Sequence, residues 1–106
     1  MAVLDPQMKR GLLENCVLAA LCRGDSYGYQ IVKELSGCVA VSESTLYPIL
    51  RRLEGSGCLQ AYSVEHNGRL RRFYRITPAG RQQAADFLKN WPEIVAMHDF
   101  IEEAKP

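Results

Sequence analysis

The chain lacks the features that mark membrane proteins, secreted proteins and enzymes. No apolar run approaches the roughly 20 residues that a bilayer span needs, and the N-terminus lacks the basic-then-apolar layout of a secretory signal. We therefore expect a cytoplasmic protein with no membrane partner. Paired loop carboxylates, a Ser/His/Asp arrangement and a glycine-rich phosphate loop are also missing, so the sequence predicts neither an enzyme nor a cofactor.

Metal-ligand spacing is absent as well. The cysteines form no C-x-x-C pair, and the two histidines, His66 and His98, lie far apart in the sequence, so no metal site is expected. The simplest interpretation of the cysteines is that they are small buried hydrophobes: Cys16, Cys22, Cys38 and Cys58. For a redox role of Cys38 or Cys58 the sequence offers no neighbourhood that would stabilise a thiolate.

What the chain does contain is typical of one soluble globular domain. Its 106 residues are 47% hydrophobic and 24% charged, which argues against disorder and for a modest core. The net charge of +1 is distributed unevenly, because residues 44–81 hold seven basic and two acidic side chains. All seven are arginines, which bind phosphates in a bidentate fashion better than lysines do. This asymmetry favours a nucleic-acid partner, although charge alone also fits a solvated basic face.

Two helices are predicted in the N-terminal third. Asp5 precedes a proline and is a suitable N-cap for a helix over residues 6–22, which Arg-Gly then ends. Ser26 is expected to cap a second helix over residues 27–35. Within it, Gly28 lowers helix propensity, so we expect it to permit close approach of a neighbouring helix.

Residues 44–54 form the most informative segment. Its apolar residues recur at i, i+3, i+4 and i+7, which indicates one buried helical face: Leu46, Ile49, Leu50 and Leu53. Stepping 100° per residue from Leu46 gives an opposite face with small, aromatic and basic groups and no acid: Ser44, Pro48, Arg51 and Gly55, flanked by Tyr47 and Arg52. The N-cap is either Ser42 or Ser44, and with Ser44 as cap Pro48 falls in the first turn. Such a surface suits a groove lined with phosphates, so this segment is a candidate recognition helix.

A β-hairpin is predicted next. Strands over residues 59–65 and 69–77 flank His-Asn-Gly, in which Asn-Gly is a strong hairpin signal. Arg69, Arg71 and the turn are expected to project furthest from the body. Because a two-stranded hairpin is marginally stable alone, it must pack against the helices.

The C-terminal segment is predicted to be one long helix. Thr77 and the following proline repeat the cap-then-proline entry. Apolar positions then recur every three or four residues: Ala84, Phe87, Leu88, Trp91, Ile94, Val95, His98 and Ile101. Pro92 removes the hydrogen bond to the Leu88 carbonyl, which predicts a kink near Trp91. This apolar stripe is wider than a small domain can cover, so we expect it to pack against the same helix of a second copy.

In this order the elements form a winged helix-turn-helix over residues 1–77 and a dimerisation helix over residues 78–106, within one mainly α structural unit that has a small β-hairpin. The sequence resembles the short, single-domain PadR family of bacterial transcriptional regulators over about residues 8 to 104. The matching stretches are Leu18-Ala19-Ala20-Leu21 before Gly24, Tyr27-Gly28-Tyr29-Gln30-Ile31, Ser44 to Glu54, and Arg71 to Gly80. The combination of T-L-Y-P with Y-R-I-T-x-A-G at this spacing is specific.

The resemblance implies a homodimeric, sequence-specific regulator of double-stranded DNA, usually a repressor that a small molecule or another signal releases. The third helix would enter the major groove, and the arginines of the hairpin wing would hold phosphates or reach the minor groove. The expected DNA contacts are Ser44, Thr45, Tyr47, Arg51, Arg52, Arg69, Arg71 and Arg72.

Three of these residues have alternative roles. Ser44 caps the helix, contacts DNA or does both. Tyr47 contacts DNA or packs against the wing. Arg52 contacts DNA or pairs with Glu54 or another acid.

The resemblance also implies a dimer interface and an effector site. The expected interface residues are Leu12, Phe87, Leu88, Trp91, Ile94, Val95, His98 and Ile101. In some family members a tryptophan of the C-terminal helix stacks on planar aromatic drugs or phenolic compounds, so Trp91 is a candidate effector-binding residue. The alternative is an interface tryptophan without a ligand.

The competing function is a winged-helix module that binds a protein partner instead of DNA. Acids on the outer face of the third helix would favour that function, and the basic character of the face favours DNA.

Overall fold

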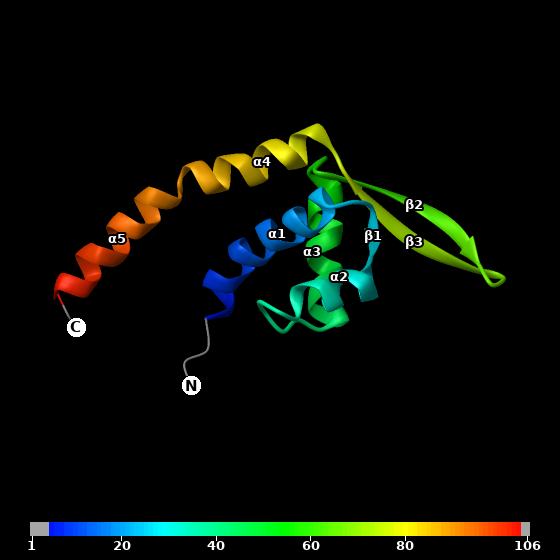
Figure 1. Cartoon of the computed structure of the whole chain (residues 1–106), viewed down its shortest axis with the longest axis horizontal. Coiled ribbons are helices and arrows are strands. Elements are labelled where there is room, and N and C mark those ends of the chain that lie inside the picture. Colours follow the sequence, from blue (N-terminus) through cyan, green and yellow to red (C-terminus); the bar gives the residue numbers. More distant parts are fainter. Residues whose placement is uncertain (1–4, 105–106) are drawn as a thin grey trace.

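The computed structural model describes residues 5–104 and contains five helices and one three-stranded antiparallel sheet (Figure 1). The elements are α1 (Pro6–Cys22), β1 (Ser26–Tyr27), α2 (Gly28–Leu35), α3 (Glu43–Gly55), β2 (Leu59–His66), β3 (Arg69–Ile76), α4 (Pro78–Lys89) and α5 (Trp91–Ala104). The predicted fold class, mainly α with a small hairpin, is confirmed. None of the helices within residues 5–104 combines the length and the apolar character that crossing a bilayer requires.

Side-chain caps begin three of the helices. The Asp5 carboxylate accepts a hydrogen bond from the Gln7 backbone N–H at 3.1 Å, and Thr77 accepts one from the Gly80 N–H at 3.1 Å. Both predicted caps are therefore confirmed. At α3 the cap is Ser42, whose hydroxyl accepts a hydrogen bond from a backbone N–H three residues later at 3.2 Å.

The prediction that Ser26 caps α2 is wrong. Ser26 lies in β1 and pairs with Tyr74 of β3, while Tyr27 occupies the N-cap position without a side-chain hydrogen bond. The partner of this two-residue strand lies far along the chain, so no local pattern around Ser26 indicates the pairing.

The hairpin forms as predicted, within one residue at each strand's end. β2 pairs with β3 from Leu59 opposite Ile76 to His66 opposite Arg69. The two-residue loop has Asn67 at φ 52° and Gly68 at φ 78°, the left-handed backbone that a tight hairpin turn requires. The sheet order is β1-β3-β2, so β1 covers one edge of the hairpin near its base.

One hydrophobic core holds α1, α2, α3 and the root of the hairpin together. Its buried members are Leu13, Val17, Leu18, Leu21, Ile31, Leu35, Leu46, Ile49, Leu50, Leu53, Cys58, Leu59, Tyr74 and Ile76. All four apolar residues predicted to form the inner face of α3 are in this cluster. The opposite face of α3 is therefore free for a partner.

The C-terminal segment forms two helices instead of one kinked helix. Asn90 ends α4, and its backbone N–H donates to the Asp86 carbonyl at 3.0 Å. Pro92 has no N–H to continue the helical ladder, so α5 begins in a new direction. Figure 1 shows α4 and α5 as an arm that leaves the body opposite the hairpin, which gives a molecule of 58 × 32 × 21 Å.

The expectation of buried cysteines holds for only part of the set. Cys58 is buried and Cys16 is half-buried, whereas Cys22 and Cys38 are exposed. Cys22 is the last residue of α1, and Cys38 follows α2 in a loop. Cys22 is adjacent to the core residue Leu21, but its own side chain faces solvent, and Cys38 lies beyond Leu35, the last core residue of α2.

Candidate nucleic-acid interface

The N-terminal turn of α3 presents a cluster of hydroxyl groups to solvent. The Ser42 Oγ lies 2.9 Å from the Ser44 Oγ and donates to the Thr45 Oγ1 at 3.1 Å. All three residues are exposed. Because Ser42 supplies the cap, the hydroxyls of Ser44 and Thr45 remain available to an incoming hydrogen-bond partner.

Ser42 is the cap, which decides between the two candidates that the sequence left open. Pro48 lies in the interior of α3 and not in its first turn, so the Ser44 carbonyl has no Pro48 N–H to accept from. The helix also begins one residue before Ser44 and so includes Glu43, an exposed acid outside the segment 44–54.

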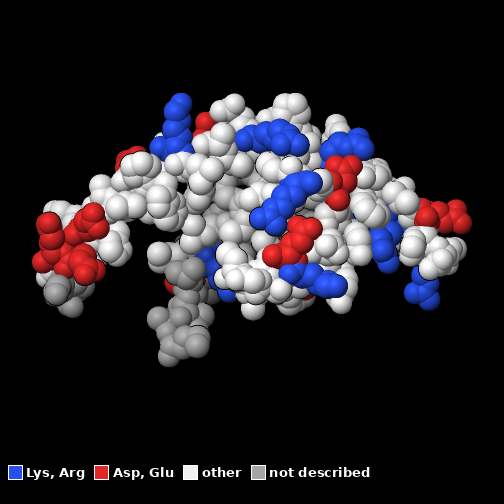
Figure 2. All heavy atoms as spheres, viewed as in Figure 1, with Lys and Arg blue, Asp and Glu red and all other residues white. Residues whose placement is uncertain are grey.

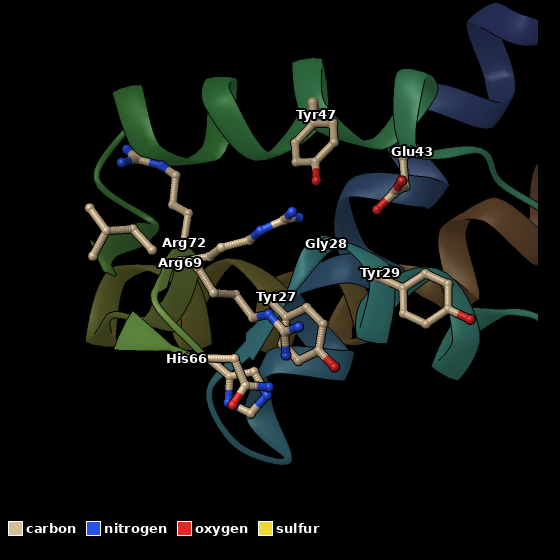
Figure 3. A pocket seen from close by; sticks show the side chains of 11 residues that line it. Tyr27, Gly28, Tyr29, Glu43, Tyr47, His66, Arg69 and Arg72 are labelled. Atoms are coloured by element: carbon tan, nitrogen blue, oxygen red, sulfur yellow. The ribbon is translucent and has the colours of Figure 1, made fainter. Parts of the chain in front are cut away.

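A hollow of about 640 Å³ separates α3 from the hairpin. Figure 3 shows Tyr47 and Glu43 reaching from α3 toward this hollow, which Tyr27 and Arg69 border from the other side. It is lined by Tyr27, Gly28, Tyr29, Glu43, Tyr47, His66, Asn67, Arg69, Leu70, Arg71 and Arg72. Four predicted DNA-contact residues from two separate elements therefore meet at one depression.

Tyr47 packs against α2 and remains 43% exposed. A Cβ placed on Gly28 would lie 2.7 Å from the Tyr47 hydroxyl oxygen, so the glycine permits this close approach between helices, as predicted. Partial burial raises the pKa of the Tyr47 hydroxyl, and the neighbouring Glu43 carboxylate raises it further. The hydroxyl therefore stays protonated and can donate a hydrogen bond.

Three of the seven arginines in this region are held by acids. Arg52 pairs with Glu14 of α1 at 2.9 Å, which settles its partner as an acid other than Glu54. Glu54 instead pairs with Arg72 of the hairpin at 3.1 Å, and this carboxylate raises the pKa of the Arg72 guanidinium. These pairs connect α3 to the elements on both of its sides.

The third pair fastens the base of the hairpin. Asp25 accepts a hydrogen bond from the Tyr62 hydroxyl at 2.6 Å and one from the Arg75 Nε at 3.1 Å. The Tyr62 hydrogen bond, followed by Arg75, holds the pKa of the Asp25 carboxyl below its usual value. The hairpin is thus tied to the loop that precedes β1.

The remaining arginines on this face are uncommitted. Within residues 5–104, no acidic group forms an ion pair with Arg51, Arg69 or Arg71. Arg71 stacks over the Tyr27 ring at 4.3 Å, which restrains its guanidinium without neutralising it. The structure therefore leaves unneutralised positive charge on α3 and on the wing.

A second basic depression was not predicted. It has a volume of about 620 Å³ and lies where the N-terminal part of α1 meets that of α3. Lys9 and Arg10 line it beside Ser42, Thr45 and Arg52. The charge distribution did not indicate this depression, because Lys9 and Arg10 belong to residues 1–43, which hold more acidic than basic side chains.

The predicted interface residues fall into two groups. Leu12 of α1 and Phe87, Leu88 and Trp91 at the α4–α5 junction line an apolar groove of about 380 Å³. The Phe87 and Trp91 rings are 5.7 Å apart. The others, Ile94, Val95, His98 and Ile101, lie on α5, of which no residue is buried.

The charges of α5 differ from those of α3. It contains Glu93, Asp99, Glu102 and Glu103 and neither Lys nor Arg. Figure 2 shows acidic side chains gathered at its far end. This end of the arm is therefore unsuited to DNA phosphates, in contrast to the arginine-bearing face.

Comparison with known proteins places this geometry in context. Residues 17–86 match the transcriptional regulator PadR-like family. Transcriptional regulator Rv3488 of Mycobacterium tuberculosis (strain ATCC 25618 / H37Rv) is 38% identical over 76 residues, covering 71% of each chain. A PadR family transcriptional regulator from Eggerthella lenta superposes with a TM-score of 0.82 at 31% identity, covering 92% of this chain and 87% of that one.

A third similar structure is Bacillus subtilis PadR in complex with operator DNA. Its TM-score is 0.66 at 23% identity, and the match covers 72% of this chain and 46% of that one. The likeness confirms the winged helix-turn-helix fold. With the family match across residues 17–86 and these relatives, the chain belongs to the PadR-like family of transcriptional regulators.

Proposed function

We propose that the protein is a homodimeric repressor that binds operator DNA. In this proposal α3 enters the major groove and the hairpin lies along the flanking backbone. The observation that carries it is the meeting of α3 and the wing at one hollow, which Arg69 and Arg71 line. Arg51 lies on α3 in a neighbouring depression with Tyr47 and Arg72, and within residues 5–104 none of these three arginines, Arg51, Arg69 and Arg71, forms an ion pair with an acid. Bacillus subtilis PadR, which shares this fold, was solved in complex with operator DNA, and this supports DNA as the partner.

Each residue of the surface has a role that its chemistry suits. Ser44, Thr45 and Tyr47 donate hydroxyl hydrogen bonds to phosphates or base edges. Arg51, on the outer face of α3, contacts a base edge, because Arg commonly binds guanine in the major groove. Glu43 is compatible with a surface that faces DNA, because a carboxylate can accept a hydrogen bond from a cytosine amino group in the major groove.

The wing and the paired arginines hold phosphates. Arg69 and Arg71 bind them directly from the hairpin. Arg52 and Arg72 use the N–H groups that Glu14 and Glu54 leave free, since a guanidinium carries five donors. The acids therefore act as positioning partners for these two cations.

Dimerisation follows from the apolar side chains of the arm. Leu88, Ile101 and Phe100 are 71%, 58% and 75% exposed in the single chain, which is unfavourable for three large hydrophobes. Residues 78–106 of two copies would cover one another and place two domains of residues 1–77 about a two-fold axis. Their α3 helices would then fit half-sites about one helical turn apart, roughly 34–36 Å. Sedimentation of a Leu88→Asp, Ile101→Asp variant as a monomer, against a wild-type dimer, tests this.

An effector would occupy the groove that Trp91 lines with α1. Its lining is mainly apolar and includes two aromatic rings, which suits a planar aromatic or phenolic compound. Trp91 is the single tryptophan of the chain, so tryptophan fluorescence reports on the surroundings of this one residue. Titration with planar dyes should quench or shift that fluorescence; an unchanged spectrum across many dyes argues that Trp91 serves the dimer only.

The decisive experiment compares Arg51→Ala with Arg81→Ala. Both arginines are exposed, but Arg51 lies on α3 in a depression with Tyr47 and Arg72, whereas Arg81 lies on α4 and does not line that depression. A site is first selected from random duplexes with wild-type protein, and affinities for that site and for random DNA are then measured. We expect Arg51→Ala to lose about 1–3 kcal/mol of discrimination and Arg81→Ala to keep it. Failure of the wild type to bind DNA in dilute buffer would refute the proposed function.

A further inference from the structure

Two cysteines from separate parts of the chain lie at one small cavity. Cys16 projects from α1, and Cys38 belongs to the loop between α2 and α3; both line a cavity of about 190 Å³. Cys38 is exposed and Cys16 is half-buried. The cavity therefore brings together the solvent-accessible thiol of Cys38 and the less accessible thiol of Cys16.

The backbone holds both positions firmly. Cys16 lies in the middle of a 17-residue helix. The Cys38 N–H donates to the Leu35 carbonyl at 2.8 Å, and the next residue donates to the same carbonyl at 2.7 Å, so the loop is fixed to the end of α2. Neither sulfur depends on a flexible terminus to meet the other.

The Cys38 thiol also affects the Cys16 thiol. Burial raises the pKa of the Cys16 thiol, and the neighbouring Cys38 thiol raises it further. Cys16 is therefore a poor first target for an oxidant, because the thiolate is the reactive form. Cys38 is the more accessible of the two.

We propose that Cys16 and Cys38 form a reversible intramolecular disulfide when a peroxide reaches the protein. The Cys38 thiolate attacks one peroxide oxygen; an S–O bond forms, the O–O bond breaks and hydroxide leaves, which gives a sulfenic acid. The Cys16 sulfur then attacks the Cys38 sulfur, an S–S bond forms, and the S–O oxygen leaves with the Cys16 proton as water. Two thiols and one hydrogen peroxide thus give one disulfide and two waters, and a dithiol reverses the reaction.

The other two cysteines are less suited to this reaction. Cys58 is buried, and its thiol donates to the Gln83 side-chain oxygen at 3.2 Å. Cys22 is exposed at the end of α1 but does not line the shared cavity. The disulfide would link α1 to the loop of residues 36–42, which ends in Ser42, the N-cap of α3.

The experiment oxidises folded protein with hydrogen peroxide, blocks free thiols with an alkylating agent and maps peptides without reduction. Trypsin leaves Cys16 and Cys22 in one peptide, residues 11–23, and Cys38 in another, residues 34–51. The Cys22→Ser variant is therefore the informative protein. We expect it to join these two peptides, to lose two free thiols and to regain both with dithiothreitol.

Two controls sharpen the result. Cys38→Ser, a change at an exposed position, should keep its fold and show no cross-linked peptide. Oxidised Cys22→Ser should melt at a higher temperature than its reduced form, since the cross-link restricts the unfolded chain, and Cys38→Ser should show no such shift. The proposal is overturned if oxidised Cys22→Ser keeps all its thiols, forms covalent dimers on a non-reducing gel, or stops at sulfinic acid.

Discussion

Replacing Gly80 by alanine tests how the C-terminal arm is joined to the winged domain. Gly80 lies in the first turn of α4, where a Cβ would collide with the Cys58 carbonyl oxygen and lie 2.8 Å from the Ile76 Cγ1. The carbonyl is backbone and accepts a hydrogen bond from the Thr77 N–H at 3.0 Å. It cannot move without disturbing that bond, so α4 must shift instead.

The magnitude follows from opposing effects. Gly-to-Ala replacement in a helix gains up to about 1 kcal/mol of helix propensity. Overpacking costs about 1–3 kcal/mol, and weakening the hydrogen bond to the Cys58 carbonyl adds about 0.5–1.5 kcal/mol. We therefore expect the free energy of unfolding of Gly80→Ala to fall by about 2 kcal/mol. For a domain of this size, that lowers Tm by roughly 8–16 °C.

Gly11→Ala is the matched control. Gly11 lies in α1, and a Cβ there would meet nothing within 4 Å. The same chemical change should raise the free energy of unfolding by about 0.5–1 kcal/mol. Urea titrations of both variants and the wild type, followed by circular dichroism, measure the difference. If Gly80→Ala were as stable as Gly11→Ala, the close packing of α4 on the hairpin root would be wrong.

Two further predictions address the hairpin and the core. Tyr62→Phe removes the hydrogen bond that lowers the pKa of Asp25, so NMR titration should show that pKa moving up toward its ordinary value. Because the pKa of Asp25 is lower in the folded state than in the unfolded state, this hydrogen bond stabilises the fold fully above the unfolded-state pKa, and the stabilisation is lost as pH falls through the folded-state pKa. The urea midpoints of the variant and the wild type should therefore converge at acidic pH. Midpoints that differ by the same amount at all pH values would contradict this explanation. Leu50→Ala, at a fully buried position of α3, should lower the free energy of unfolding by about 2–5 kcal/mol in urea titrations. Leu70→Ala, on the hairpin with 76% of the residue exposed, should change it little, and equal losses in the two variants would contradict the assigned core.

The fold was predictable where one short stretch of sequence contains the whole signal. The helix-period pattern of α3, the Asn-Gly turn and the Asp5 and Thr77 caps each depend on residues within one or two turns of each other. The Ser26 prediction failed because β1 is defined by its pairing with β3, which no local pattern contains. The break in the C-terminal helix was predictable only in part. Pro92 indicated where the break lies, but not whether the helix bends there or ends.

The candidate site was predictable in composition more than in arrangement. Arginine clustering identified the relevant segment, and an acidic partner was one of the alternatives for Arg52, but the sequence did not identify that partner as Glu14 of α1. That pairing arises from α1 lying beside α3. Lys9 and Arg10 were missed for the same reason, because their proximity to α3 exists only after folding.

The interruption at Asn90 has a mechanical consequence for an assembly built on α5. α4 packs closely against the body at Gly80, whereas Pro92 donates no backbone hydrogen bond to the preceding turn. The bend between α4 and α5 is therefore the least constrained point of the arm. Any molecule lodged against Trp91, on the first turn beyond that bend, would act at its pivot. In the proposed dimer, a small angular change at this bend would move the two α3 helices relative to each other by a larger distance, because the body extends away from the bend.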